Sequence, residues 1–280
     1  MIKCALSACS DFDHARRPYA GVLIRTLEEL GIQVSRTSTV ITSHTRPSPE
    51  EKAAELNAFY EDHDLSRIYD MSGGNSAHEL LPYLDYDAIS RSQTVYYGYS
   101  DLTVILNAVY AKTGKKGVLW SVMNLLRSAS GQQRKCFDTP DMYRFRTRFL
   151  QGFHMEGILV GGNVRCLLKL ENTAYFPDLH DKLLLLEARS GDEEQIGTYF
   201  ARLHRLGAFE QIKGVILGTF TALEKQGGDP WKLLKDYIPD NLPAVKTDEI
   251  GHGGNSKAVW IGACYQLDAS MERSEAPGNE

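Results

Sequence analysis

Short β-rich runs alternate with amphipathic helical stretches along the first 120 residues, and this alternation most limits the fold. The first unit is a mostly apolar strand at 2–6 followed by a helix at 18–30, which ends at Gly31. Segments that alternate in this way form a parallel sheet with helices on both faces, and functional sites collect at the carboxyl ends of its strands. The pattern predicts further strands at 32–40, 67–71, 93–97 and 117–120, and helices at 49–60, 77–82 and 102–112.

A second α/β segment follows a polar, arginine-rich stretch at about 121–153. We therefore expect an N-terminal doubly wound domain over 1–115, an inter-domain connection over 116–150 and a C-terminal α/β domain over 151–280, with the active site in the cleft between the domains. In the C-terminal domain the pattern predicts strands at 156–160, 182–186, 213–217, 244–248 and 258–262, and helices at 192–206 and 230–237.

Composition excludes several classes of protein. The chain has 280 residues, of which 42% are hydrophobic, enough for one large or two modest domains. No run approaches the ~20 apolar residues of a membrane helix, and the first residues become polar too soon for a signal peptide, so we expect a cytoplasmic protein. The five cysteines are scattered without a CxxC pair, and a net charge of −5 without a basic block gives no sign of nucleic-acid binding.

The segment QTVYYGYSDLTVILN (93–107) predicts a strand that stops at Gly98 and restarts as a helix at Leu102. A sharp turn of this kind holds the hydroxyl of Ser100 out into solvent above a helix N-terminus, as hydrolases present a nucleophilic serine. The match is partial, because Leu102 stands where a small residue is usual. The alternative is that Ser100 or Asp101 simply caps the helix.

Three other strand ends carry candidate residues. The turn at Gly73 and Gly74 could bring backbone N–H groups close to an anion, although an ordinary tight turn gives the same pattern. Glu187 follows four leucines, where a carboxylate is desolvated unless a partner pairs with it. His252 lies between glycines and could be that partner.

Ser100, Glu187 and His252 occur in the chain order nucleophile, acid, base that α/β hydrolases also use. Eight histidines and 36 acidic residues allow many such triples, so spacing alone leaves the assignment open. A metal site is less favoured, since no second ligand lies near His252 at a spacing typical of zinc. We expect no cofactor.

Five sequence blocks recur in order: GGNSAHELLPYLDYDAI (73–89), GYSDLTVILNAVYAKTG (98–114), GGNVRCLL (161–168), LLLEARSGDEEQIGTYFARLHRLGAFEQIKGVILGTF (184–220) and EIGHGGNSKAVWIG (249–262). Together they resemble the LD-carboxypeptidase family of serine peptidases, which also contains the microcin C immunity peptidases. The resemblance covers roughly residues 65–265 and implies that Ser100 is the nucleophile, Glu187 orients the histidine and His252 is the general base. It also implies an oxyanion hole built from the N–H groups of Asp101 and of Gly73 or Gly74, and a homodimer.

The family's usual substrate is the cytoplasmic murein tetrapeptide, whose terminal D-alanine is removed during cell-wall recycling. Its free carboxylate needs a cationic or N–H-rich recess, for which the chain offers Asn75, Arg127, Arg165 and the glycine turns. Two departures from the family stand out: VLWSVMNLLRSASG (118–131) replaces a His-Gly-Pro-type segment, and the opening strand runs into ALSACSDFDHARR (5–17) rather than a Pro-Ser turn. The first leaves the substrate pocket undefined.

Two other functions stay open. A microcin-immunity-like peptidase would cleave a peptidyl- or aminoacyl-nucleotide and needs an aromatic side chain to stack on the base, for which Trp120 is a candidate unless it belongs to the core. A non-catalytic two-lobed ligand-binding protein would retain the fold, but the presence of all three triad residues counts against it.

Overall fold

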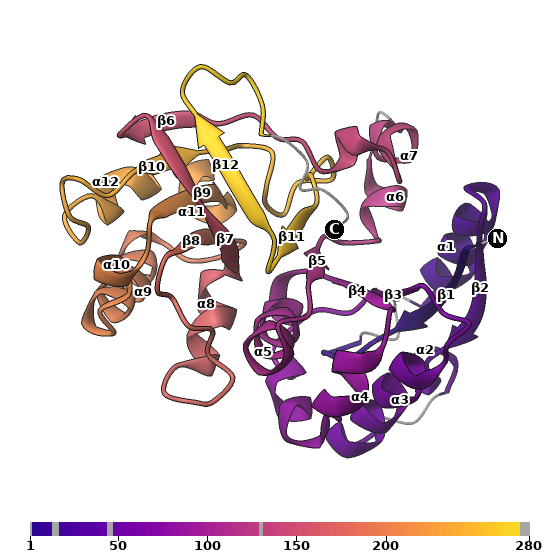
Figure 1. Ribbon diagram of the computed structural model, residues 1–280. Helices are drawn as coiled ribbons and strands as arrows, with labels where there is room; N and C mark the ends of the chain where they lie inside the picture. Colours follow the sequence, from indigo (N-terminus) through magenta and orange to yellow (C-terminus); the bar gives the residue numbers. More distant parts are fainter. Residues whose placement is uncertain (1, 13–16, 44–46, 129–130, 275–280) are drawn as a thin grey trace.

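The computed structural model describes residues 2–12, 17–43, 47–128 and 131–274 and shows two mixed sheets flanked by helices (Figure 1). In the first sheet β1 to β5 are parallel, and β11 pairs antiparallel with β5 at one edge. The strand order is β11-β5-β4-β3-β1-β2. Its strands are β1 (Ile2–Ser7), β2 (Ile32–Thr37), β3 (Arg67–Asp70), β4 (Val95–Gly98), β5 (Gly117–Leu119) and β11 (Val259–Ile261).

The second sheet has four parallel strands in its middle and an antiparallel strand at each edge. The strand order is β12-β7-β8-β9-β10-β6. Its strands are β6 (Arg148–Gln151), β7 (His154–Asn163), β8 (Lys182–Ala188), β9 (Gly214–Phe220), β10 (Ala244–Lys246) and β12 (Cys264–Asp268). The expectation of two α/β domains is thereby confirmed.

Helices connect the parallel strands of both domains. Helix α3 begins with the capping box that its sequence predicts, since Ser48 and Glu51 exchange side-chain-to-backbone bonds around Pro49. The first domain contains α1 (Arg17–Glu29), α2 (Thr39–Thr42), α3 (Pro49–Glu61), α4 (Tyr86–Arg91), α5 (Thr103–Thr113) and the 3-10 helices η2 (Ala77–Tyr83) and η3 (Ser100–Leu102). The connection and second domain contain α6 (Asn124–Arg127), α7 (Gln132–Cys136), η4 (Pro140–Met142), α8 (Val164–Leu167), η5 (Leu168–Leu170), α9 (Glu193–Arg205), α10 (Ala208–Gln211), α11 (Thr221–Lys225) and α12 (Pro230–Leu234).

Two strands lie elsewhere than the sequence suggested. The strand predicted at 258–262 was assigned to the C-terminal domain, but β11 adds to the first sheet by pairing with β5. Strand β6 falls in the stretch taken as a connection, and it pairs with β10 of the second sheet. Periodicity predicts that a segment is a strand but not which strand it pairs with, so the chain crosses between the domains more often than expected.

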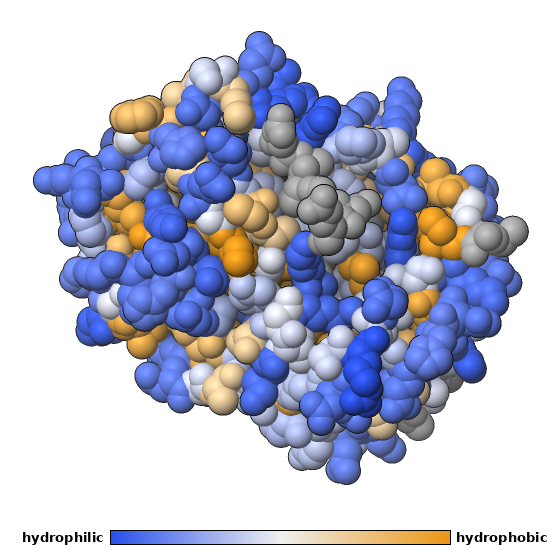
Figure 2. Space-filling model, viewed as in Figure 1, coloured by the Kyte–Doolittle hydropathy of each residue, from blue (hydrophilic) through white to orange (hydrophobic). Residues whose placement is uncertain are grey.

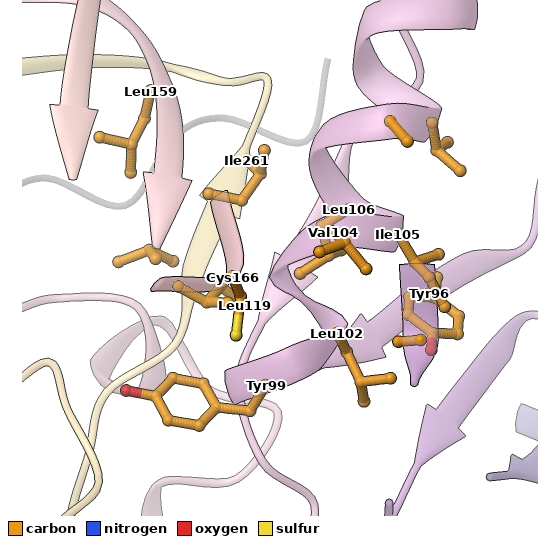
Figure 3. Close-up of a cluster of buried hydrophobic side chains, with 14 of the residues drawn as sticks. Tyr96, Tyr99, Leu102, Val104, Ile105, Leu106, Leu119, Leu159, Cys166 and Ile261 are labelled. Carbon is orange, nitrogen blue, oxygen red and sulfur yellow. The ribbon is translucent and has the colours of Figure 1, made fainter. Parts of the chain in front are cut away.

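Among the described residues, one of the three clusters of buried hydrophobic side chains spans both domains. Helix α5 lies between the sheets, and its residues from Thr103 to Val109 are all buried. Figure 3 shows residues of α5 and residues of the second domain, among them Leu159 and Cys166, in one cluster of buried side chains. By contrast, hydrophilic residues predominate on the face of the molecule that Figure 2 shows. The shared core fixes the position of one domain against the other.

Candidate active site

Ser100 lies at the apex of a strained turn between β4 and α5. Tyr99 continues the extended backbone with φ −144° and ψ 162°, and Ser100 then adopts φ 60°. A non-glycine residue in this left-handed region is uncommon and costs energy, and such residues concentrate at functional turns. The geometry is that of a nucleophile elbow.

The unusual Leu102 fits this elbow because of Gly98. A Cβ atom at Gly98 would lie 2.8 Å from the Leu102 Cβ and 2.8 Å from the Tyr96 ring, so only glycine lets the fully buried Leu102 pack there. The capping alternative is not seen: neither η3 nor α5 has a side-chain cap bond. Ser100 and Asp101 therefore do not cap the helix that follows them.

Glu187 and His252 form a hydrogen-bonded pair. The His252 Nδ1 atom lies 2.8 Å from Glu187 Oε2, and the Asn163 side-chain amide donates to Glu187 Oε1 at 3.0 Å. The Glu187 side chain is fully buried within β8, and β7 places Asn163 directly beside it in register. Because a carboxylate only accepts hydrogen bonds, Nδ1 carries the proton and Nε2 is left as the basic atom.

The second ring nitrogen of His252 has no partner. Nε2 is buried and without a hydrogen bond among the residues that the structure describes. The ring of Tyr99 packs edge-on against the imidazole, with 4.9 Å between the centroids, and holds its orientation. Burial, and then the negative charge of Glu187, raise the pKa of Tyr99 well above its ordinary value, so this side chain stays neutral.

A cavity of about 460 Å³ between the two domains brings these groups together. Ser100 and Gly74 line it from the first domain, and His252 lines it from the second. Among the described residues its lining includes Arg127, Arg165 and Arg189 but no aspartate or glutamate, although the whole chain is acidic. The cavity is therefore suited to a ligand with anionic groups.

The glycine turn contributes one available backbone donor. Gly73 N–H donates to the Asp11 carbonyl at 3.3 Å, whereas Gly74 N–H has no partner in the described part of the chain. A Cβ atom at Gly74 would come within 2.3 Å of Asp11 Oδ2, and its φ is +157°, so this position requires glycine. Of the two glycines predicted for the oxyanion hole, Gly74 is therefore the one whose N–H remains available to a ligand.

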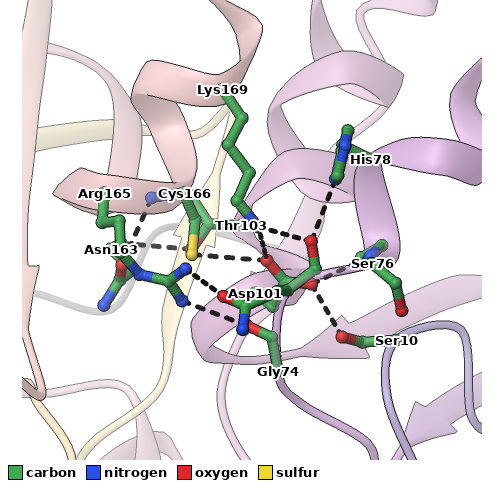
Figure 4. Close-up of polar contacts among 12 residues, drawn as sticks. Ser10, Gly74, Ser76, His78, Asp101, Thr103, Asn163, Arg165, Cys166 and Lys169 are labelled. Carbon is green, nitrogen blue, oxygen red and sulfur yellow. Dashed lines mark hydrogen bonds and ion pairs between the residues drawn. The ribbon is translucent and has the colours of Figure 1, made fainter.

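The side chain of Asp101 points away from the cavity. Its fully buried carboxylate accepts bonds from Ser10 Oγ at 2.7 Å and Ala77 N–H at 2.9 Å and pairs with Lys169 Nζ at 2.5 Å (Figure 4). Burial raises the pKa of Asp101, but the bonds from Lys169, Ser10 and Ala77 outweigh burial and lower the pKa below its ordinary value. Only the backbone of Asp101 remains for an oxyanion hole.

Asn75 and Arg165, predicted to bind substrate, line the cavity and bind each other. The Arg165 guanidinium donates to Asn75 Oδ1 and to the Gly74 carbonyl, the latter at 3.1 Å (Figure 4). Arg127 also lines the cavity. Trp120, the candidate for base stacking, is 1% exposed, donates to Gln133 Oε1 and lies outside the cavity lining, so it belongs to the core.

Sequence reasoning missed three residues of this region. Asn163 was recognised only as the end of a strand, although a polar residue there, parallel to a strand that carries Glu187, was a usable signal. Arg189 lies two residues beyond Glu187 and lines the cavity, and no side-chain partner is found for it among the described residues. Lys169 had no sequence signal, because its partner Asp101 lies 68 positions away.

The described residues offer neither a metal site nor a membrane-spanning helix. No cluster of three or more histidine, cysteine, aspartate or glutamate side chains there could hold a metal ion. Nor does any helix in those ranges have the length and apolar character needed to cross a membrane.

Comparison with known proteins gives consistent matches along most of the chain. The model of the LD-carboxypeptidase N-terminal domain matches residues 4–119, and that of the LD-carboxypeptidase C-terminal domain matches residues 156–267. The putative carboxypeptidase YocD of Bacillus subtilis is 26% identical over 278 residues, covering 87% of this chain and 86% of the relative. The microcin C7 self-immunity protein MccF of Escherichia coli is 24% identical over 260 residues, with coverages of 78% and 76%.

Solved structures share the fold. MccF in complex with glutamyl sulfamoyl guanosine superimposes with a TM-score of 0.85 at 18% identity, covering 99% of this chain and 96% of that one. Muramoyltetrapeptide carboxypeptidase from Oxalobacter formigenes gives a TM-score of 0.80 at 19% identity, with 97% of both chains covered. Because the two family models together match most of its length, this chain belongs to the LD-carboxypeptidase family.

Proposed function

We propose that this protein is a serine carboxypeptidase that hydrolyses the amide bond before the C-terminal D-amino acid of the murein tetrapeptide. The observation that carries the proposal is the His252–Glu187 pair, whose unpartnered Nε2 belongs to a residue lining the same cavity as Ser100. A relative named probable murein peptide carboxypeptidase, from Bacillus subtilis, is 27% identical over 256 residues. The substrate is a cytoplasmic recycling intermediate, so the proposal places the enzyme in the cytoplasm.

The two ring nitrogens of His252 have different roles in the proposed reaction. His252 Nε2 removes the Ser100 proton while the alkoxide attacks the scissile carbonyl, and Glu187 stabilises the imidazolium through Nδ1. The backbone N–H groups of Gly74 and Asp101 hold the oxyanion, each worth about 3 kcal/mol in comparable sites. His252 then protonates the leaving D-alanine, and water attacks the acyl-enzyme by the same route.

A peptidyl- or aminoacyl-nucleotide is the second candidate substrate. It is supported by the similarity to MccF, whose solved complexes contain glutamyl sulfamoyl guanosine and aspartyl sulfamoyl adenosine, and by cavity arginines that suit a phosphate as well as a carboxylate. The burial of Trp120 removes one stacking residue from this candidate. The murein tetrapeptide needs no stacking partner, so we rank it first.

The test is release of D-alanine from the tetrapeptide L-Ala, D-Glu, diamino acid, D-Ala by purified protein. We expect release by the wild type and none by Ser100→Ala, with correct folding of the variant verified by circular dichroism. Equal release by both would rule out Ser100 as the nucleophile. Turnover of an aminoacyl sulfamoyl nucleotide without D-alanine release would select the second candidate, and binding without turnover of either would select the non-catalytic alternative.

The homodimer that the family resemblance implies is likewise a proposal for this chain. Light scattering of the purified protein tests it, and a mass of one chain would refute it.

A further inference from the structure

One short segment of the second domain contacts both elements that supply the proposed oxyanion donors. This segment, α8 and η5 (164–170), carries Arg165 and Lys169 across the domain boundary (Figure 4). Lys169 Nζ donates to Asp101 Oδ1 at 2.5 Å and to the Asn75 carbonyl at 2.8 Å. The ammonium group thus joins the serine elbow to the glycine turn.

The two acceptors lie next to the two proposed donors in the chain. Asp101 follows Ser100, and its own N–H is one donor; Asn75 follows Gly74, whose N–H is the other. Arg165 adds a bond to the Gly74 carbonyl at 3.1 Å, so both carbonyls of the turn are held from the second domain. An oxyanion hole works only when its donors lie about 3 Å from the developing charge, which makes their relative position decisive.

The Lys169–Asp101 pair is shielded from solvent. The Asp101 side chain is fully buried and that of Lys169 is 18% exposed, so water screens the pair far less than an ion pair at the surface. Without the ammonium, Asp101 would keep a buried charge whose remaining donors among the described residues are all neutral: Ser10 Oγ, Ala77 N–H and the weakly donating Cys166 Sγ. The elbow would then shift or Asp101 would take up a proton.

We propose that Lys169 is a positioning residue that sets the geometry of the oxyanion hole, acting through Asp101 and the Gly74–Asn75 turn. Lys169 lies outside the residues that line the cavity, so it acts on catalysis without touching the substrate. This inference rests on the proposed function, because it takes Ser100 as the nucleophile and the two backbone N–H groups as its oxyanion donors.

The first experiment compares Lys169→Met with Lys169→Arg in the tetrapeptide assay. We expect Lys169→Met to lower kcat by about 10- to 100-fold, less than the loss of a whole donor, with KM changed less than about threefold. Lys169→Arg should restore most of the rate, because a guanidinium can donate to both acceptors. A loss that appears in KM rather than kcat, or no loss, would overturn the proposal.

The matched control is Lys246→Met. Lys246 is another shielded lysine, 12% exposed, that bridges Glu224 at 3.0 Å and Asp248 at 2.7 Å on strand β10, away from the cavity. Its loss should reduce stability and leave kcat unchanged. If both variants lower kcat alike after correction for folded protein, Lys169 has only a structural role.

A second measurement separates this proposal from the identity of the peptide. A fluorophosphonate probe reacts with an activated serine when its Oγ displaces fluoride from phosphorus, and the phosphoryl oxygen occupies the oxyanion hole. Lys169→Met should slow labelling of Ser100 by a factor similar to its effect on kcat, and Lys246→Met should not. Labelled wild type that releases no D-alanine would reject only the proposed substrate, whereas equal labelling of wild type and Lys169→Met would reject the positioning role. A wild type that is not labelled would overturn both the nucleophile and the inference built on it.

Discussion

At position 187 of strand β8 a carboxylate follows four buried leucines, Leu183 to Leu186. Its burial is compatible with folding because His252 Nδ1 and the Asn163 amide each meet one of its oxygens. Two residues farther along the chain, Arg189 is exposed and lines the cavity. Its side chain has no partner in the described part of the chain. Two side chains only two positions apart at the end of β8 thus have different surroundings: Glu187 pairs with His252, and Arg189 lines the cavity.

We predict that Arg189 selects substrates with a free terminal carboxylate. A hydrogen bond to a charged group contributes about 1.5–3 kcal/mol, which corresponds to roughly 10- to 100-fold in affinity. Arg189→Gln should therefore raise KM for the tetrapeptide by about this factor and leave kcat nearly unchanged. The measurement is steady-state kinetics on the tetrapeptide and on the same peptide with an amidated C-terminus.

The amidated peptide shows whether Arg189 recognises the terminal carboxylate or contributes to the binding of any peptide. The wild type should have a much lower KM for the free acid than for the amide, and Arg189→Gln should reduce this difference in KM. Arg205→Gln, which removes an exposed arginine outside this cavity, should leave the preference as it is. An unchanged preference in Arg189→Gln would show that another group reads the carboxylate.

Helix α5 joins the serine elbow to the second domain through buried polar contacts. Asn107, fully buried, donates to the Gly161 carbonyl at 2.9 Å and accepts from Gly161 N–H at 2.8 Å. Thr103 Oγ1 accepts from Asn163 N–H at 3.1 Å. The helix that begins beside Ser100 therefore also places the end of β7, where Asn163 contacts Glu187, and this couples the two halves of the site.

We predict that Asn107→Ala destabilises the protein and weakens catalysis together. The change leaves two buried backbone groups of Gly161 unpaired, at a cost of about 1–3 kcal/mol each before relaxation. Urea denaturation should show a free energy of unfolding lower by about 2–4 kcal/mol, and kcat of the folded protein should fall because the Asn163–Glu187 contact shifts. Lys112→Ala, an exposed change on the same helix, is the control and should alter neither. Unchanged stability in Asn107→Ala would mean that water replaces both bonds.

Across the whole molecule, the two sheets are tied into one unit. A single cluster of buried residues includes side chains from both domains, and β11 returns from the second domain to complete the first sheet. Relative motion of two domains is expected unless their interface is large and hydrophobic, and here the interface is part of the core. The cavity between the domains is therefore held by packing as well as by the Lys169–Asp101 pair.

We predict that both domains unfold in a single transition, although chains of this length often unfold in steps. Calorimetric and van't Hoff enthalpies should agree, and tryptophan fluorescence should report the same midpoint as far-ultraviolet circular dichroism. Trp120 and Trp260 belong to the first domain and Trp231 to the second, so Trp231→Phe reports on the first domain and the double variant Trp120→Phe, Trp260→Phe reports on the second. Two separate midpoints would refute a shared core.

The sequence by itself determined the features that depend on local pattern. Alternating strands and helices gave two α/β domains, the run from Gly98 to Leu102 indicated a sharp turn, and the five blocks identified the family, because each of these is written in neighbouring residues. The order of Ser100, Glu187 and His252 suggested their roles, which remain predictions for experiment.

Only the tertiary structure decided which distant groups meet. In the structure β11 pairs in the first sheet, Asn163 contacts Glu187, and Lys169 contacts Asp101. The Gly73 N–H donates to the Asp11 carbonyl, and Arg189 lines the cavity. These contacts join segments far apart in the chain, where no periodicity or spacing carries information about pairing. Their physical basis is the packing of the shared core, which sets the distances at which buried charges and backbone donors find partners.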